Sequence, residues 1–167
     1  MPEPGIVKIN TDGASKQNGL FSSCGGVIRG ELGNWIADFS ANLGVGSNSK
    51  AEHFGILYGL ELAWKMGFRK VQLESDSSAM LELISKGSTT YHPHFPIIQE
   101  CRNLISKYWS IQLGHVYREG NYVADWLANL RVSLQIGYHL WDKPPDGLSL
   151  LLLHDILGIA QCRIVAF

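Results

Sequence analysis

The sequence predicts an α/β fold in which helices flank one mixed sheet. Two features support this prediction: residues 6–42 contain three short apolar strands in succession, and from residue 51 onward segments with helical periodicity alternate with further strands. Successive strands favour antiparallel pairing, whereas strands separated by helices favour right-handed parallel crossovers. A chain of 167 residues, 46% of them hydrophobic, can bury one good core and is short for two.

Three strands are predicted in the N-terminal quarter of the chain. Residues 6–12 alternate with a period of two and end at Asp12-Gly13, so Asp12 is expected at a strand terminus. Residues 24–29 and 35–42 are the next two strands. The glycine-bearing segment between them is typical of a hairpin turn.

A long helix is predicted next. Ser47 and Ser49 are candidate N-caps, and apolar residues recur at helical spacing from Ala51 until Gly67 ends the pattern. This assignment places Glu52 in the first turn of the helix.

The remaining core elements alternate between strand and helix. A short apolar strand is followed by a polar segment rich in helix-capping residues, so Asp76 is expected where strand meets helix. Pro96 suits the first turn of a later helix, and Asn121 is a candidate cap for the last one. The predicted elements are a strand at 71–73, a helix at 79–84, a helix at 96–108, a strand at 111–117 and a helix at 123–130.

Four carboxylates lie near these predicted strand ends and helix starts: Asp12, Glu52, Asp76 and Asp125. Taken singly, each has an ordinary explanation, since turn residues and acids near helix N-termini are favourable for local reasons. Taken together, they predict a divalent-metal site, because hard cations such as Mg²⁺ prefer oxygen ligands and a two-metal site needs several carboxylates.

Composition narrows the classes of function. The formal net charge is −1, so bulk charge does not indicate a nucleic-acid partner, and any such binding must be local. The three cysteines are widely spaced without a CxxC pair, which excludes a cysteine zinc site and fits a reducing compartment. The N-terminus lacks the features of a signal peptide, and no apolar run approaches the roughly 20 residues of a membrane span. We expect a soluble intracellular protein, nuclear or cytoplasmic, with no membrane association.

Five segments carry an ordered set of motifs: Asn-Thr-Asp-Gly-Ala at 10–14, Gly-Gly-Val-Ile-Arg at 25–29, Ala-Glu at 51–52, Glu-Ser-Asp-Ser at 74–77 and Arg-Glu-Gly-Asn-Tyr-Val-Ala-Asp-Trp-Leu-Ala at 118–128. In order and spacing they resemble a type 1 ribonuclease H domain. More narrowly, they resemble the reverse-transcriptase-like ribonuclease H domains abundant in plant genomes as retroelement relatives. The resemblance covers roughly residues 6 to 131 and is far more specific than a lone motif.

The resemblance implies a fold and an activity. It implies a five-stranded mixed sheet in the strand order 3-2-1-4-5, and cleavage of the RNA strand of RNA-DNA hybrids with two Mg²⁺ ions, for which Mn²⁺ is a substitute. The four acidic positions of the family correspond to Asp12, Glu52, Asp76 and Asp125, all still carboxylates. Asp125 is the weakest of the four, because its orientation depends on where its helix begins.

A fifth catalytic residue is expected shortly before the last acid. His115 is one candidate, but it shares a predicted strand face with Ile111 and Leu113, which is typical of an ordinary strand residue. Arg118 matches the Arg-Glu-x-Asn context of family members with a shorter loop. We therefore assign Arg118 to phosphate contact or product release, with a surface ion pair to Glu119 or another acid as the alternative.

Substrate contacts are expected from small and polar residues near the acids. Recognition of a hybrid relies on shape, phosphates and ribose 2′-hydroxyl groups. Gly13, Ala14 and Ser15 suit close approach of a backbone, and Asn48 and Asn121 are candidate polar contacts. Turn and capping roles are the alternative for these five residues.

Three readings of function and two of organisation follow. The first function is the metal-dependent endonuclease. The second is a catalytically silent, domesticated module that binds nucleic acid or protein. Residues 87–108 carry only Arg102 and Lys107 as basic residues, so little positive charge there can hold a substrate, which leaves room for the second reading. A third, more distant reading is another nuclease or transposase with the same sheet.

We divide the chain into a ribonuclease H-like domain at 1–133 and an apolar C-terminal extension at 134–167. The extension either docks on the domain or mediates a homodimer, and it resembles the segment that follows this domain in plant retroelement polyproteins.

Overall fold

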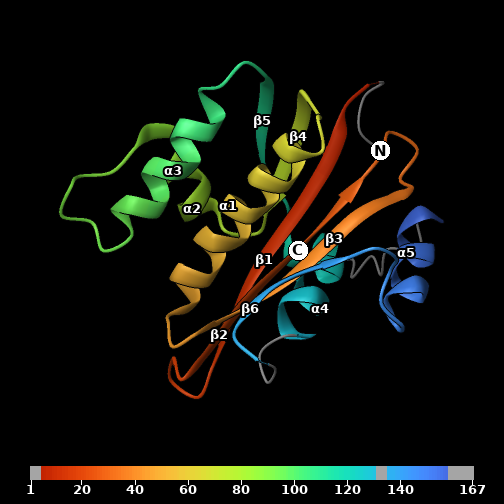
Figure 1. The fold of residues 1–167 in the computed structure, drawn as a ribbon, viewed down its shortest axis with the longest axis horizontal. Coiled ribbons are helices and arrows are strands. Elements are labelled where there is room, and N and C mark those ends of the chain that lie inside the picture. The colour runs from red at the N-terminus through yellow and green to blue at the C-terminus, as the bar shows by residue number, and fades with distance from the viewer. Residues whose placement is uncertain (1–4, 131–134, 158–167) are drawn as a thin grey trace, which may run out of the picture.

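The computed structural model describes residues 5–130 and 135–157, and in it one mixed sheet carries helices on both faces (Figure 1). The elements, in chain order, are β1 (Val7–Lys16), β2 (Phe21–Arg29), β3 (Trp35–Gly44), α1 (Asn48–Lys65), β4 (Lys70–Ser75), α2 (Ser78–Lys86), α3 (Phe95–Ile105), β5 (Ser110–His115), the 3₁₀ helix η1 (Arg118–Gly120), α4 (Tyr122–Leu130), β6 (Gly137–Trp141) and α5 (Leu148–Ile156).

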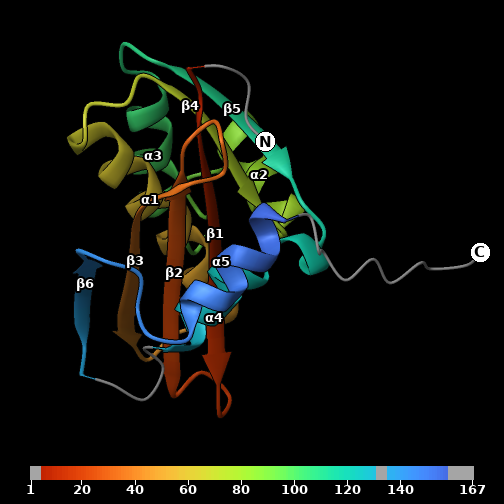
Figure 2. The same cartoon turned by 90° about the vertical axis from the view of Figure 1, so that its right-hand side faces the viewer.

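The sheet has six strands in the order β5-β4-β1-β2-β3-β6. The pairs β1–β2, β2–β3 and β3–β6 are antiparallel. Strand β4 pairs parallel with β1, and β5 pairs parallel with β4 (Figure 2). The expected order 3-2-1-4-5 is confirmed. The expected count of five strands is wrong, because β6 in the C-terminal segment pairs with the outer edge of β3.

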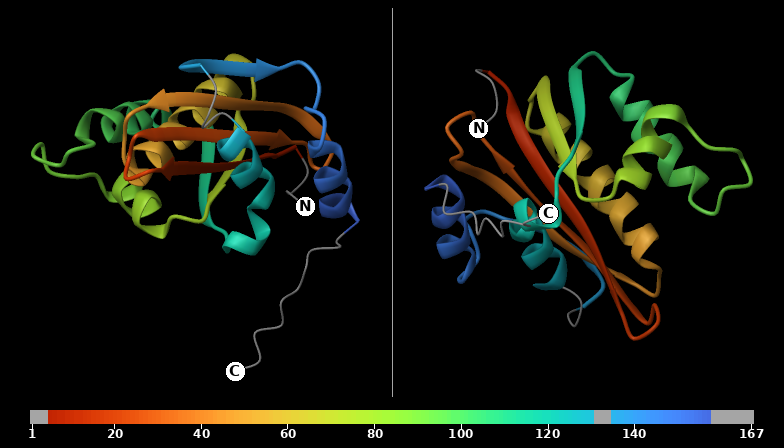
Figure 3. Two further views of the ribbon diagram at one scale, coloured as in Figure 1. Left: turned by 90° about the horizontal axis from the view of Figure 1, so that it is seen from below. Right: turned by 180° about the vertical axis from the view of Figure 1, so that it is seen from behind.

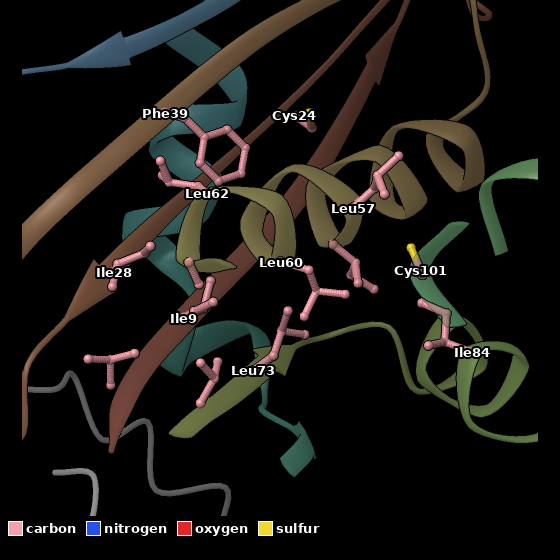
Figure 4. Packing of buried hydrophobic residues seen from close by; sticks show 14 of the residues in the cluster. Ile9, Cys24, Ile28, Phe39, Leu57, Leu60, Leu62, Leu73, Ile84 and Cys101 are labelled. Atoms are coloured by element: carbon pink, nitrogen blue, oxygen red, sulfur yellow. The ribbon is translucent and has the colours of Figure 1, made fainter. Parts of the chain in front are cut away.

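Two layers of helices divide the core. Helices α1, α2 and α3 cover one face of the sheet, and α4 and α5 cover the other (Figure 3). The larger core lies under α1 and includes Ile9, Phe39, Leu60 and Leu73, all fully buried (Figure 4). Because successive strand side chains point to opposite faces, neighbouring strand residues serve different layers. The smaller core contains Val27, Val123, Leu127, Leu148 and Leu152.

Two local predictions near the acids are corrected. Strand β1 does not end at Asp12 but continues to Lys16, because it pairs with β2 along its whole length. Only its parallel pairing with β4 stops, at Thr11 and Ser75, so Asp12 is the first residue beyond that ladder. Helix α1 begins at Asn48, and Glu52 therefore lies beyond the first turn.

The early start of α1 has a local cause. Ser47 is the N-cap, and its hydroxyl accepts a hydrogen bond from the Lys50 backbone N–H at 3.1 Å. At the other end, the chain leaves the helix through Gly67, whose φ of +87° favours glycine. Two other predicted bounds were too long, since α3 ends at Ile105 and β5 at His115.

The described part of the C-terminal segment, β6 and α5, packs against the rest of the chain. Strand β6 forms an antiparallel ladder with β3, and Leu148 and Leu152 of α5 are buried in the smaller core. The opposite side of α5 leaves Leu150 and Leu153 exposed. Within residues 5–130 and 135–157, no helix has both the length and the apolarity needed to cross a membrane.

Candidate metal centre

Three of the four predicted acids converge. One carboxylate oxygen from each of Asp12, Glu52 and Asp76 lies within 4.8 Å of the others, and we call this group the acidic cluster. The three residues come from β1, from α1 and from the connection between β4 and α2. Three oxygens at this separation form an arrangement that suits a divalent cation.

Gly13 allows α1 to approach β1 closely enough to form the acidic cluster. A Cβ atom at position 13 would lie 2.3 Å from the backbone nitrogen of Glu52. Any side chain would therefore push α1 away from the strand that carries Asp12. Glycine at position 13 therefore permits the short distance between Asp12 and Glu52.

The acidic cluster is electrostatically unfavourable for the carboxylates themselves. The pKa of Asp12 is raised to about 8, first by burial, then by the charge of Asp76, and further by Asp125 and Glu52; a hydrogen bond from the Gly13 N–H to Asp12 Oδ1 at 2.8 Å opposes the shift. The pKa of Glu52 is also raised, mainly by burial. A bound cation would stabilise these charged forms, because it supplies the missing opposite charge.

Hydrogen-bond donors surround the acidic cluster but leave one of its carboxylate oxygens without a partner among the described residues. Asn48 donates its side-chain amide to Glu52 Oε1 at 2.9 Å, and the hydroxyl of Ser77 also hydrogen-bonds to Glu52. Arg118 Nε lies 3.8 Å from Asp76 Oδ2, and its side chain is 83% exposed. Asp76 Oδ1 is buried and accepts no hydrogen bond from the residues that the structure describes. This orphaned acceptor fits a metal ligand, since a buried unpaired carboxylate oxygen is otherwise costly.

Asp125 lies beside the acidic cluster and is not a member of it. Its backbone N–H donates to the Asn121 carbonyl at 3.1 Å, and its Oδ1 accepts from the Asn129 side chain at 3.1 Å. Its charge contributes to the raised pKa of Asp12, so the two carboxylates repel each other. Asp125 also lines a shallow pocket with Arg118, Glu119 and Tyr122.

The two candidates for the fifth catalytic residue both lie next to Asp76. His115 Nε2 is 3.2 Å from the Asp76 backbone carbonyl, and its side chain is exposed at the end of β5. Arg118 faces the Asp76 carboxylate from η1. Of these two side chains, only that of Arg118 faces the Asp76 carboxylate.

The five predicted substrate contacts differ in accessibility. Asn48 is exposed, and Ser15 is partly exposed while its hydroxyl donates to the Gly46 carbonyl at 3.0 Å. Gly13 and Ala14 are buried in β1. Asn121 is 1% exposed, and its side chain does not cap α4 but donates to the Thr11 carbonyl at 3.0 Å.

Two polar residues near the acids had not been singled out from the sequence. Ser77 hydrogen-bonds to Glu52. Asn129 lies one helical turn after Asp125 and donates its side-chain amide to the Asp125 carboxylate. A weak signal was present for each, since Ser77 follows Asp76 directly and Asn129 is spaced four residues from Asp125.

The sequence is similar to a known family and to a plant protein. The family model described as reverse transcriptase-like matches residues 10–131. A protein of Arabidopsis thaliana named for ribonuclease H is 42% identical over 162 residues, which cover 97% of this chain and 26% of that protein. The chain thus spans about a quarter of the length of this relative.

Solved structures share the fold. The N-terminal ribonuclease H domain of a Mycobacterium tuberculosis protein, solved as a fusion with maltose-binding protein, superposes with a TM-score of 0.71 at 28% identity, over 76% of this chain and 93% of that one. The LC11 ribonuclease H1 in complex with an RNA/DNA hybrid superposes with a TM-score of 0.69 at 23% identity, over 75% of this chain and 96% of that one. Because the matching family model spans all four acidic positions and these neighbours share the sheet, the chain belongs to the reverse transcriptase-like family of ribonuclease H-like domains.

Proposed function

We propose that this chain is a metal-dependent endonuclease that hydrolyses the RNA strand of RNA-DNA hybrids by a two-metal-ion mechanism. The observation that carries the proposal is the acidic cluster, with three carboxylate oxygens within 4.8 Å and the buried Asp76 Oδ1 without a hydrogen-bond partner among the described residues. Mg²⁺, or Mn²⁺ in its place, prefers such oxygen ligands.

The four acids would divide between two ions. Asp12 lies on β1, a central strand of the sheet, and would contribute to holding both ions. Glu52 and Asp76 would complete the shell of one ion, and Asp125 that of the other. When bound, the ions lower the pKa of a water molecule and offset charge on the leaving 3′ oxygen. The chain itself holds the carboxylates in place, through the Gly13 N–H on Asp12 and the Asn129 amide on Asp125.

Arg118 would contact the scissile or a neighbouring phosphate. Its guanidinium is exposed and its Nε is 3.8 Å from Asp76, a separation at which a solvent-exposed ion pair contributes little. A phosphate oxygen can therefore compete for this side chain at small cost. In that position Arg118 would neutralise the substrate and leave Asp76 free to bind metal.

Hybrid recognition would come from the surface around the acidic cluster. The exposed Asn48 amide lies 2.9 Å from Glu52 and can reach a ribose 2′-hydroxyl, which only the RNA strand offers. The relatives support this substrate class, since the plant and mycobacterial proteins are named for ribonuclease H.

A specific observation favours a second candidate, the catalytically silent binding module. Arg102, one of the two basic residues at 87–108, donates from Nη1 to the carbonyls of Ile84 at 2.7 Å and Ser85 at 2.9 Å. It therefore caps the C-terminal end of α2, which orients the side chain toward that helix and reduces its availability for phosphate contact. Weak substrate affinity is expected for either candidate.

Cleavage of labelled substrates separates the two candidates. A labelled RNA-DNA hybrid, a double-stranded RNA and a DNA duplex are incubated with the chain and Mg²⁺ or Mn²⁺, and Asp76→Asn is compared with wild type. The endonuclease proposal requires cleavage of the hybrid alone, lost in the variant. If the chain binds nucleic acid but forms no cleavage products, the endonuclease proposal is wrong and the silent binding module is supported.

A further inference from the structure

A chain of polar side chains connects α5 to the metal centre, and we call it the Arg29 network: the partly exposed Asp155 and the buried Arg29, Asn10 and Asn121. Arg29 ends β2 and is 8% exposed. Its Nη1 forms an ion pair with Asp155 of α5, and its Nη2 donates to Asn10 Oδ1 at 2.8 Å. Its Nε is buried without a hydrogen-bond partner among the described residues, and the charge of Glu74 also acts on the guanidinium.

Arg29 sets the direction of the hydrogen bonds that follow. A guanidinium can only donate, so Asn10 must present its oxygen to Arg29 and its nitrogen to the other side. Asn10 Nδ2 accordingly donates to Asn121 Oδ1 at 3.3 Å and to Glu74 Oε2 at 3.1 Å. Asn121 Nδ2 then donates to the Thr11 carbonyl at 3.0 Å. The Glu74 carboxylate and the Thr11 carbonyl can only accept, so they favour the same two amide orientations that Arg29 requires.

The far end of the Arg29 network lies at the metal centre. Thr11 immediately precedes Asp12, and the Asn121 carbonyl accepts the N–H of Asp125 at 3.1 Å. Asn121 also follows η1, which carries Arg118. The network thus ties the first acid, the fourth acid and the arginine to one buried set of hydrogen bonds.

We propose that Asp155 is a positioning residue for the metal centre. It acts through Arg29 and the two asparagines to fix the start of α4, and with it Asp125 and Arg118, relative to Asp12. Without Asp155 the buried guanidinium loses its ion pair and keeps only the more general charge of Glu74, so it can shift away from Asn10 and loosen the hydrogen bonds that lead to Asn121. The C-terminal segment is then part of the active-site framework. The predicted effect on cleavage rests on the proposed function, whereas the effect on local order does not.

Hydrogen exchange on the metal-free full chain tests the ordering role. Asp155→Asn should raise exchange of the backbone amides of residues 118–125 by about tenfold, because these amides open locally when Asn121 is loosened. Ile84→Val in α2 is the matched control, since it weakens the core on the opposite face and contacts no member of the network. Arg29→Lys is a second variant that keeps the charge and should produce the same local increase.

Metal binding tests the functional consequence. Mn²⁺ affinity, measured by calorimetry, should fall about tenfold in Asp155→Asn, as is typical when a group that orients metal ligands is removed, and Asp155→Glu should restore it. In an Arg29→Met background, Asp155→Asn should cause no further loss, because the two residues act in series.

The outcomes decide between positioning and simple tethering of α5. Unchanged exchange at residues 118–125, or an equal change in Ile84→Val, would overturn the positioning role. Additive losses of Mn²⁺ affinity in the double variant would overturn it as well. If wild type cleaves no hybrid, the proposed function fails, and the exchange and calorimetric results still decide this inference.

Discussion

Gly13 and Glu52 are in backbone contact across the interface between β1 and α1: a Cβ atom on residue 13 would stand 2.3 Å from the Glu52 nitrogen. This contact sets how close the helix that carries the second acid can come to the strand that carries the first. A distance of functional importance therefore depends on the absence of one side chain.

Gly13→Ala should displace α1 and lower both stability and cleavage. Overpacking of a tight interface typically costs about 1–3 kcal/mol, and the displaced Glu52 would weaken metal binding further. Gly114→Ala in β5 is the control, since its Cβ would meet nothing closer than 3.5 Å. Urea unfolding and hybrid cleavage measure the two effects, and equal behaviour of the two variants would contradict the packing argument.

The raised pKa of Asp12 predicts how stability depends on pH and metal. The pKa of Asp12 is about 8 in the folded chain against an ordinary value of 3.8, so the folded state binds a proton more tightly than the unfolded state. In EDTA, the stability contributed by protonated Asp12 is complete below about pH 4 and is lost as pH rises toward 8. The melting temperature measured in EDTA should therefore fall as the pH is raised from 4 to 9.

Mg²⁺ should offset that loss. Deprotonated acids bind the ion, so the increase in melting temperature on adding Mg²⁺ should be larger at pH 8 than at pH 5. Asp142→Asn, at an exposed position, serves as the control and should keep the same dependence on Mg²⁺. A melting temperature that does not change when Mg²⁺ is added at pH 8 would argue against the metal centre.

Much of this site was predictable from local sequence, and the rest depends on contacts between distant residues. Asp76 follows a short apolar strand and precedes capping serines, so its place at the strand end was visible. The extension of β1 past Asp12 was not, because it requires the register with β2, in which Asp12 faces Gly25. The β1–β2 turn also places Gln17 and Asn18 at positive φ, which no glycine-based rule indicates.

The sixth strand and the role of Asn121 were hidden for the same reason. Strand β6 has a largely exposed side-chain pattern and forms against an open edge of β3, some hundred positions earlier in the chain. Asn121 looks like an N-cap in sequence, but its amide is taken by the Thr11 carbonyl. Pattern rules locate elements, whereas the partners of a buried amide emerge only from the packed structure.

Asp12→Asn and Asp125→Asn should separate the two proposed ion positions. Asp12 belongs to the acidic cluster and Asp125 does not. Cleavage should fall to background in both variants, because each ion is needed for hydrolysis. Stabilisation by Mg²⁺ should disappear in Asp12→Asn and persist in Asp125→Asn, which leaves the three clustered oxygens intact. Loss of Mg²⁺ stabilisation in both variants would instead indicate one shared ion.

Arg118→Ala should impair cleavage and leave stability nearly unchanged. The side chain is 83% exposed and its ion pair with Asp76 spans 3.8 Å, so removing it should alter the free energy of unfolding by less than about 1 kcal/mol. Loss of a phosphate contact should reduce kcat/KM about tenfold or more, and Arg118→Lys should restore part of it. His115→Ala provides the comparison, because His115 reaches only the Asp76 carbonyl. A larger loss of kcat/KM in His115→Ala than in Arg118→Ala would transfer the catalytic role to the histidine.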